Sequence, residues 1–333
     1  MKKRNRFSKW VIGFSSVLII FVLGFGSSPG QAADKATLKV VSAWPQNNKM
    51  NDALRMLQKK VTEKSKGMLE IAWAGGPEAI PAFQLVEALR NNVVDVAWTA
   101  HTYNVAQVPV MEGAKLSRIT PWKEREIGVF DFYVNVYKKQ LNAQYLGRGT
   151  PGLTYSLYTT VPVATLADFK GMPIRVTPAY KAFVEALGAA PVATDPGEVH
   201  SALDRKLVKG YGWPSLGISD FGWDEVTKFV IEPPFYQVDV MAFININAWN
   251  RLPKDLQELL SASVQEAEKE AYDHFKKLIS EDREKITKKG IQEIKLQKEE
   301  ADKYLQTAYD ASWKEVIKKD PQQGPQLRDL LSK

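Results

Sequence analysis

The segment Asp168–Pro214 begins Asp-Phe-Lys-Gly-Met-Pro-Ile-Arg-Val-Thr-Pro, passes through Leu-Gly-Ala-Ala-Pro-Val-Ala and ends Ala-Leu-Asp-Arg-Lys-Leu-Val-Lys-Gly-Tyr-Gly-Trp-Pro. This pattern predicts a strand at 174–176 and a helix from about 179 to 187 that ends at Gly188. A second strand, another helix and an extended Gly-Tyr-Gly-Trp-Pro crossing follow. Strands that alternate with short helices are typical of parallel βαβ units. The segment therefore predicts an α/β fold, in which Arg175 either packs over the core or presents a cation at a cleft.

The first part of the chain has the same rhythm. Strands are predicted at 37–44, 68–73 and 93–98, with helices over 48–64 and around 85–89. Such alternation is typical of a doubly wound sheet, whose ligands collect at the carboxyl ends of the strands. Trp98 and Tyr103 lie at or just past the end of the most apolar strand. We predict that they line a cleft, with ordinary core packing as the alternative.

The rest of the chain contains one unusually long helix, predicted over 253–289 from apolar residues at steps of three or four. At about 55 Å it exceeds the diameter of a small domain. We expect it to lie across two lobes; a coiled coil is the alternative. The other predicted elements are a helix over 122–141, extended pieces at 153–157 and 161–163, a long strand over 235–248, a strand over 291–296, a helix over 301–318 and a loose tail from Pro321.

The N-terminal residues have the order of a secretory signal, in which a basic segment precedes an apolar run over 10–25 and small residues up to Ala33. The basic residues are Lys2, Lys3, Arg4, Arg6 and Lys9. An uncleaved membrane anchor is the alternative, but the apolar run is shorter than the ~20 residues that a spanning helix needs. We expect an exported protein, cleaved after Ala32 or Ala33.

Composition limits the function classes. The net charge of +7 is mostly in this signal, since without its five basic residues 40 Lys and Arg face 38 Asp and Glu. The charge therefore gives no argument for a nucleic-acid partner. The absence of cysteine excludes a disulfide scaffold and a thiolate metal site. About 300 mature residues suit two domains.

Motifs for catalysis are missing. The sequence has no Gly-x-Ser-x-Gly elbow, no phosphate-binding Gly-x-x-x-x-Gly-Lys and no His-Glu-x-x-His. His101, His200 and His274 share no metal-type spacing. We therefore expect no enzyme, no catalytic residue, no metal and no cofactor. An exported hydrolase is the alternative and predicts turnover of a bound ester or amide.

The segment around Arg175 resembles a family signature. Residues 168–176 are similar to the Asp-x-Lys-Gly-x-Lys-Ile-Arg-Val motif of the substrate-binding proteins of TRAP transporters, the DctP-type family. The similarity continues through Leu187-Gly-Ala-Ala-Pro-Val and the helix with Ala202-Leu203. Asn245-Ile-Asn-Ala-Trp-Asn-Arg-Leu-Pro253 resembles the Asn-x-x-x-Trp-x-x-Leu-Pro that precedes the family's long helix. The resemblance covers essentially the whole mature chain.

The resemblance implies a two-lobed α/β periplasmic binding protein, type II-like, with two doubly wound sheets joined by hinge strands and a lobe-spanning helix. The expected parts are a signal peptide over 1–33, lobe I over 34–157 and 243–270, lobe II over 158–242 and 271–320, the helix 253–289 across both, and a tail over 321–333. Such a protein closes on an organic acid anion and delivers it to a small and a large membrane permease subunit. We expect a lipid-free periplasmic monomer, with a dimer through the long helix as the alternative.

In this family the strand arginine pairs with the ligand carboxylate, a role that maps onto Arg175. A planar guanidinium holds a carboxylate through two parallel hydrogen bonds. Beside it we expect Trp213 and Tyr211 as an aromatic wall. The further candidate substrate-binding residues are Trp98 and Tyr103 on the facing lobe, Asn245 near the hinge, Tyr155 and Phe235.

The chain departs from the family pattern near this arginine. Lys209 and Gly212 replace an aspartate and a glutamate, which argues against a metal-assisted site, and Tyr155 stands where some members have a second arginine. These losses favour a monocarboxylate, or an aromatic or keto acid, over a sugar acid. A two-ended C4-dicarboxylate, with Arg148 or Lys209 at its far end, is the alternative. A binding protein of an ABC importer or of a sensor kinase is a further alternative.

Overall fold

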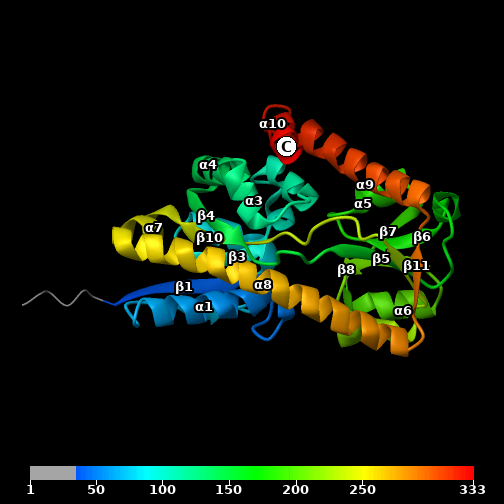
Figure 1. Ribbon diagram of the computed structural model, residues 1–333, viewed down its shortest axis with the longest axis horizontal. Helices are drawn as coiled ribbons and strands as arrows, with labels where there is room; N and C mark the ends of the chain where they lie inside the picture. The colour runs from blue at the N-terminus through cyan, green and yellow to red at the C-terminus, as the bar shows by residue number, and fades with distance from the viewer. Residues whose placement is uncertain (1–34, 195) are drawn as a thin grey trace, which may run out of the picture. The chain divides into compact units, whose positions relative to one another are not determined.

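The computed structural model describes residues 35–194 and 196–333 (Figure 1), so the predicted signal peptide lies outside the described residues. The described residues form a two-lobed α/β fold around two β-sheets. Lobe I here denotes the first sheet with its covering helices, and lobe II the second. Among the helices of these residues, none combines the length and the apolar character that crossing a membrane requires.

The sheet of lobe I has the strand order β2-β1-β3-β10-β4. Its strands are β1 (Ala36–Ser42), β2 (Leu69–Gly75), β3 (Val96–Ala100), β4 (Ala143–Arg148) and β10 (Val240–Asn245). β1 pairs with β2 and β3 in parallel, and β10 is antiparallel to both of its neighbours. Strand β10, from late in the chain, therefore lies between β3 and β4. Lobe I is thus built from two separate parts of the sequence.

The sheet of lobe II has the order β11-β9-β5-β8-β6-β7. Its strands are β5 (Tyr155–Thr159), β6 (Pro173–Val176), β7 (Ala190–Ala193), β8 (Gly210–Pro214), β9 (Phe229–Glu232) and β11 (Gln292–Lys295). β6 pairs in parallel with β7 and β8, and β5 is antiparallel to β8 and β9. The predicted βαβ segment thus forms one half of this sheet, with Arg175 on the strand between β8 and β7.

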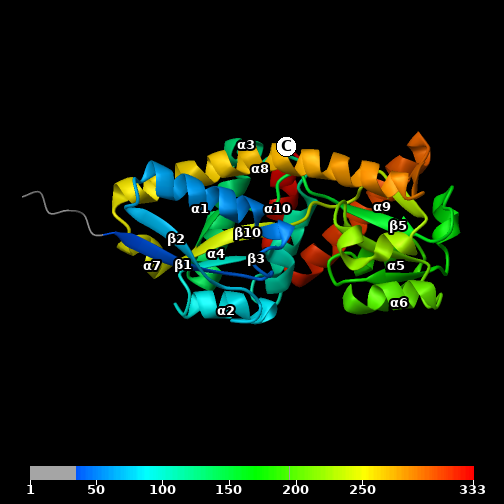
Figure 2. The same cartoon turned by 90° about the horizontal axis from the view of Figure 1, so that it is seen from below.

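Helices cover the faces of both sheets. In lobe I they are η1 (Lys49–Asn51), α1 (Asp52–Lys64), η2 (Ala82–Gln84), α2 (Leu85–Arg90), η3 (His101–Asn104), η4 (Pro109–Leu116), α3 (Pro121–Glu126), α4 (Val129–Leu141) and α7 (Ile246–Arg251). In lobe II they are η5 (Leu166–Phe169), α5 (Lys181–Ala186), η6 (Pro196–Glu198), α6 (Val199–Asp204), η7 (Ile218–Phe221) and η8 (Trp223–Glu225). Figure 2 shows α1 on one face of the first sheet and α2 on the other.

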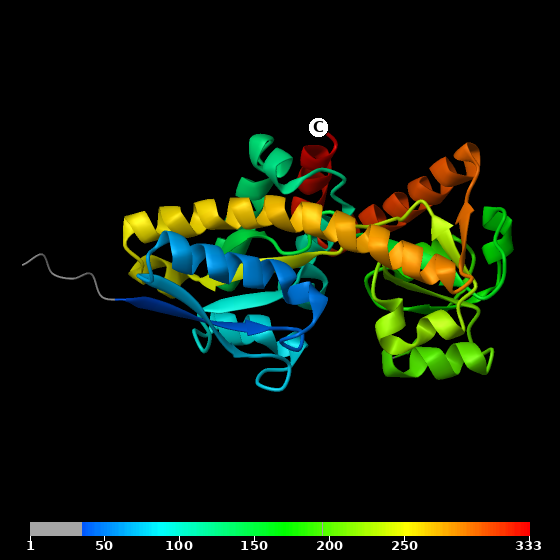
Figure 3. The same ribbon diagram turned by 60° about the horizontal axis from the view of Figure 1, so that its bottom comes forward.

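The long helix α8 (Lys254–Lys288) has 35 residues and confirms the predicted element. Its first half packs Leu260, Val264 and Ala271 into the core that α1 and the first sheet share. Near its end, Ile286 packs with Trp223 in a core of the second lobe. Figure 3 shows α8 passing from one sheet to the other. The helix therefore lies across both lobes.

The end of the chain is helical, so the predicted loose tail is wrong. α9 (Lys298–Lys319) is followed by α10 (Gln323–Leu331), whose Leu327 is buried. Leu327 and Trp313 pack against Gly113 of η4, where even a Cβ would lie 2.9 Å from the Leu327 side chain. Helix α10 is too short for its few apolar residues to show a clear helical period. The sequence alone therefore does not distinguish it from a polar tail.

The local predictions around Arg175 are confirmed, while longer elements differ in detail. Helix α5 ends before Gly188, whose φ of +77° lies in the left-handed region. The predicted helix over 122–141 is two helices, because Gly128 adopts a left-handed φ of +85° between α3 and α4. The predicted strand over 235–248 is shorter, since β10 covers only its central part.

Candidate functional site

Arg175 lies on β6 with only 1% of its surface exposed. Its Nε donates a hydrogen bond to the carbonyl oxygen of Thr194 at 3.0 Å, and its Nη1 donates to the hydroxyl of Tyr180 at 3.1 Å. Its guanidinium carbon is 5.9 Å from the centre of the Trp213 ring. Within residues 35–194 and 196–333, no ion pair includes Arg175, although the other deeply buried arginine, Arg148, has one.

Tyr180 links Arg175 to strand β8. Its hydroxyl donates to the carbonyl oxygen of Gly212 at 2.6 Å and accepts the hydrogen bond from Arg175. A Cβ at Gly212 would lie 2.5 Å from a carbon of the Tyr180 ring. Burial raises the pKa of the Tyr180 hydroxyl, although the charge of Arg175 acts in the opposite direction, so the hydroxyl is neutral at neutral pH. Sequence reasoning missed Tyr180; the glycine at 212 was its only signal.

Trp213 lies at the carboxyl end of β8, in a group of three aromatic rings. Its ring centre is 4.6 Å from that of Trp223 and 5.3 Å from that of Phe221. Phe221 is 44% exposed. Trp213 therefore lies beside Arg175 and packs against rings of η7 and η8, which sequence reasoning did not name. That these rings form a wall for the ligand stays a prediction.

Tyr155 and Phe235 lie on the other side of Tyr180. The ring centres of Tyr155 and Tyr180 are 5.7 Å apart, and that of Phe235 is 5.9 Å from Tyr180 and 6.1 Å from Tyr155. Burial raises the pKa of Tyr155 well above its usual value. Phe235 is buried and packs deeper into the core. Tyr155 is thus a neutral, half-buried residue whose ring packs against Tyr180 and Phe235.

Tyr103 follows β3 and lies in lobe I, with Trp44 and Phe83 around it. Its ring centre is 5.9 Å from Trp44 and 4.9 Å from Phe83, which is 70% exposed. Burial, with a smaller effect of the Asp239 carboxylate, raises the pKa of Tyr103 to about 12. The charge of Arg175 partly offsets this rise. The Tyr103 hydroxyl therefore lies within the electrostatic range of an arginine that belongs to the other lobe.

A hydrogen bond and an ion pair join the two lobes. Lys115 of η4 donates to the carbonyl oxygen of Ala179 at 2.6 Å and pairs with Glu112 at 3.2 Å. Ala179 directly precedes Tyr180, so the buried lysine anchors the segment that carries this tyrosine. Lys49 of η1 lies 3.6 Å from Asp220 of η7. Both contacts connect loops at strand ends of lobe I with loops of lobe II.

Trp98 and Asn245 lie on strands of lobe I. Tyr211 is the strand partner of Arg175 where β8 pairs with β6, but its side chain packs into a core of lobe II. Trp98 is buried between the first sheet and α1, and its Nε1 donates to the carbonyl oxygen of Met50 at 2.8 Å. Tyr211 is stacked on a core tyrosine, with its hydroxyl 2.8 Å from that of Thr227. Asn245 caps α7 through its side-chain oxygen and donates to a backbone carbonyl of α2. Their polar atoms are hydrogen-bonded within one lobe, and their contact with a ligand stays a prediction.

The two cations considered for the far end of a diacid are also elsewhere. Arg148 is buried in an ion pair with Glu124 of α3. Lys209 is exposed and precedes β8, whereas Trp213 lies near the opposite end of that strand. Neither side chain contributes a second positive charge beside Arg175.

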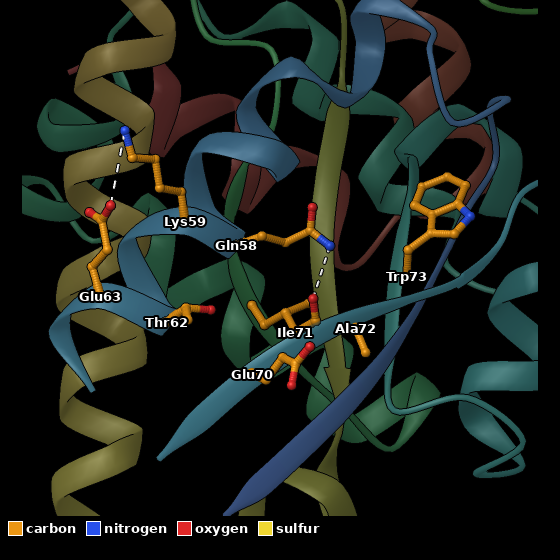
Figure 4. A pocket seen from close by; sticks show the side chains of 8 residues that line it. All are labelled: Gln58, Lys59, Thr62, Glu63, Glu70, Ile71, Ala72 and Trp73. Carbon is orange, nitrogen blue, oxygen red and sulfur yellow. Dashed lines mark hydrogen bonds and ion pairs between the residues drawn. The ribbon is translucent and has the colours of Figure 1, made fainter. Parts of the chain in front are cut away.

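In the described residues, neither a cluster of metal-ligating side chains nor the open pocket of lobe I involves Arg175. In the described part of the chain, no group of three or more His, Asp and Glu side chains could hold a metal ion. An open pocket lies between α1 and the edge strand β2, where Gln58 donates to the Ile71 carbonyl and Trp73 forms one side (Figure 4). None of its lining residues belongs to the group around Arg175.

Comparisons with known proteins agree with this architecture. Residues 40–320 match a family model named DctP and described as bacterial extracellular solute-binding protein, family 7. A monocarboxylate 2-oxoacid-binding periplasmic protein of Nostoc sp. is 22% identical over 285 residues, which cover 80% of this chain and 76% of that protein.

Two solved structures are similar in fold. A TRAP periplasmic solute-binding protein from Desulfovibrio salexigens with bound orotic acid has a TM-score of 0.77 at 19% identity and covers 90% of this chain and 98% of its own. An extracytoplasmic solute receptor of Bordetella pertussis that binds pyroglutamic acid has a TM-score of 0.72 at 18% identity, with 90% and 100% covered. At these identities the likeness shows the two-lobed fold.

Proposed function

The chain belongs to bacterial extracellular solute-binding protein family 7, the DctP family of TRAP transporter solute-binding proteins, and from its site we propose that it captures a small organic acid anion with Arg175 as the carboxylate clamp. Proteins of this family bind small-molecule ligands outside the cytoplasm and work with membrane permease subunits. For this chain we infer a lipid-free periplasmic monomer, released from residues 1–33, that delivers its ligand without chemical change to a small and a large permease subunit.

The burial of Arg175 is the observation that carries this proposal. An unpaired charge away from water is strongly unfavourable, so buried charges are paired or meet a ligand of opposite charge. The partners of this guanidinium within the described residues are a carbonyl, a hydroxyl and an aromatic ring, all of them neutral. A ligand carboxylate supplies the missing charge and fits the planar donors in two parallel hydrogen bonds.

The neighbours of Arg175 support a ligand with one carboxylate and an apolar, aromatic or keto body. Trp213 lies next to the guanidinium, Tyr155 packs against Tyr180, which is hydrogen-bonded to it, and the charge of Arg175 acts on Tyr103 of lobe I. Of the two cations considered for a far carboxylate, Arg148 is paired with Glu124 and Lys209 lies beyond the opposite end of β8 from Trp213, so neither supplies a second charge beside Arg175. The name of the Nostoc relative, a monocarboxylate 2-oxoacid-binding protein, supports the same class. Membership of the family favours a TRAP permease over an ABC importer or a sensor kinase.

The proposed lobes follow the strands of the two sheets. We propose lobe I over 34–157 and 243–270 and lobe II over 158–242 and 271–320. The sheets themselves favour moving two of these limits by a few residues, because β5 begins at Tyr155 in the second sheet and β10 begins at Val240 in the first. Both ends of the hinge would then fall in the segments 149–154 and 233–239.

A ligand panel tests the proposed function. Calorimetry of the mature protein with pyruvate, 2-oxoisovalerate, phenylpyruvate, benzoate and succinate is expected to give a monocarboxylate that binds about tenfold or more tightly than succinate. The primary amide of that acid should bind much more weakly, because it lacks the charge that Arg175 needs. Tightest binding of succinate would support the dicarboxylate alternative. Binding of neutral solutes alone, or an uncharged molecule co-purifying with the protein, would show that the proposal is wrong.

Binding of this ligand is expected to be independent of pH between about 6 and 9. The pKa of Tyr103 is raised to about 12 and that of Tyr155 is raised well above its usual value, so both hydroxyls keep their protons throughout this range. A ligand carboxylate is ionised at every pH within it. Calorimetry at constant ionic strength measures the dissociation constant across the range. A titration step in the affinity within this window would contradict the neutral state of these hydroxyls.

A further inference from the structure

We propose that Tyr180 is a positioning residue, which fixes the Arg175 guanidinium for a carboxylate, and that Gly212 is glycine because this tyrosine needs the space. The inference rests on the proposed function and deepens it by naming what prepares the clamp. Neither residue was predicted to contact ligand. Tyr180 acts through Arg175, and Gly212 acts through Tyr180.

The Tyr180 hydroxyl is hydrogen-bonded to Arg175 and to strand β8, and it also interacts with Thr177. A phenol has one donor hydrogen, and that hydrogen is directed to the Gly212 carbonyl at 2.6 Å. Its lone pairs then face the Nη1 of Arg175 at 3.1 Å. On the other side of the guanidinium, Nε is held by the Thr194 carbonyl at 3.0 Å. Two acceptors at different edges of a planar fork fix the rotation of that plane, which a bidentate contact requires.

The ring of Tyr180 is held by contacts on several sides. Tyr155 and Phe235 pack against it, with ring centres 5.7 and 5.9 Å away. On the side of β8 it lies directly on Gly212, where an added Cβ would be 2.5 Å from one ring carbon and 2.7 Å from another. Any side chain at position 212 must therefore displace this ring. The position of the Tyr180 ring therefore depends on the absence of a side chain at Gly212.

The chemical consequence concerns charge. A carboxylate beside Arg175 would orient the guanidinium too, but it would also neutralise it. The buried hydroxyl of Tyr180 stays neutral and orients the arginine without cancelling its charge. The full attraction of the buried guanidinium is then available to the ligand.

The first test needs no ligand. In an NMR spectrum of arginine Nε–H groups, the signal of Arg175 is identified by its loss in Arg175→Met. We expect this signal to shift in Tyr180→Phe and in Gly212→Ala, because each change disturbs the contact from a different side. Tyr158→Phe is the matched control: Tyr158 is a buried tyrosine whose hydroxyl also donates to a β8 carbonyl, that of Pro214 at 3.2 Å. An Arg175 signal that is the same in Tyr180→Phe as in wild type would overturn the proposal.

The second test measures affinity for the tightest-binding acid of the panel. Tyr180→Phe is expected to weaken binding about tenfold, the scale of a hydrogen bond to a charged group. In the Arg175→Lys background the same change should weaken binding by no more than about twofold, since a lysine has no guanidinium plane to orient. Tyr158→Phe should bind like wild type. Equal losses in both backgrounds, or an equal loss in Tyr158→Phe, would show that Tyr180 has only a structural role.

The two tests separate this inference from the proposed function. If no acid of the panel binds the wild-type protein, the proposed function fails, while the NMR signal of the free protein still decides whether Tyr180 positions Arg175. If an acid binds and the tyrosine change has no effect on signal or affinity, the function stands and the positioning role is wrong.

Discussion

Arg175→Met is expected to remove tight carboxylate binding and to leave the free protein at least as stable as wild type. Loss of one partner from a buried, hydrogen-bonded charge pair costs about 2–5 kcal/mol, which is roughly a 30-fold or greater loss of affinity. Without ligand, the free energy of unfolding is expected to stay the same or rise, because methionine fills a similar volume and buries no charge. Calorimetry with the best monocarboxylate measures the first effect, and urea unfolding measures the second.

Two other arginine variants make this test specific. Arg251→Met removes an exposed arginine that pairs with Asp95 at 2.9 Å on lobe I, and its affinity should equal that of wild type. Arg175→Lys should fall between wild type and Arg175→Met, because it keeps the charge and loses the planar pair of donors. If Arg175→Met binds as tightly as wild type, Arg175 is not the anchor. If it unfolds, the arginine serves the structure of lobe II instead.

Short-range patterns in the sequence predicted the elements that depend on neighbouring residues. The helix that ends at Gly188 is one example, since a left-handed glycine at a helix end is a local requirement. The 35-residue helix α8 is another, because its apolar stripe repeats over many turns. The α/β class and the two lobes followed from such elements in order and from the resemblance around Arg175.

Long-range pairing could not be predicted in the same way. β10 lies between β3 and β4, and β5 lies between β8 and β9, each antiparallel to its neighbours. Nothing in the residues of a strand states which partner it will meet a hundred positions away. Helix α10 was not predicted for a related reason, because it is short and is stabilised by packing on η4.

At the site, the sequence predicted which kind of residue lies beside Arg175 better than it predicted which position does. Tyr211 and Trp213 are two residues apart on β8, yet only Trp213, nearer the carboxyl end, lies over the guanidinium. Tyr211 is deeper in the strand, where it meets Trp223 in the core. Tyr180 had no recognisable motif of its own, and its role depends on the distant Gly212. Contacts of this kind require the three-dimensional arrangement of strands.

Glu268→Ala is expected to destabilise lobe I strongly, by about 3–5 kcal/mol. Glu268 lies on α8 and is 2% exposed. Its carboxylate accepts from Nη1 of Arg125 at 2.6 Å and from the backbone N–H of Arg148 at 2.7 Å, so it joins α8 to α3 and β4. Burial raises the pKa of this carboxyl, and Arg125 opposes the rise. Breaking such a buried pair costs about 3–5 kcal/mol.

Glu266→Ala is the matched control for this change. Glu266 lies two residues away on the same helix and pairs with Lys64 of α1, but both side chains are largely exposed. Exposed pairs contribute about 0–1 kcal/mol, so the urea midpoint should hardly move. Glu268→Gln should fall between the two, because its amide oxygen still accepts from Arg148 and only the charge opposite Arg125 is lost. Equal midpoints for the two alanine variants would mean that the contacts of Glu268 do not hold α8 on the first sheet. The contact between α8 and lobe I would then be stabilised by the apolar packing of Leu260, Val264 and Ala271.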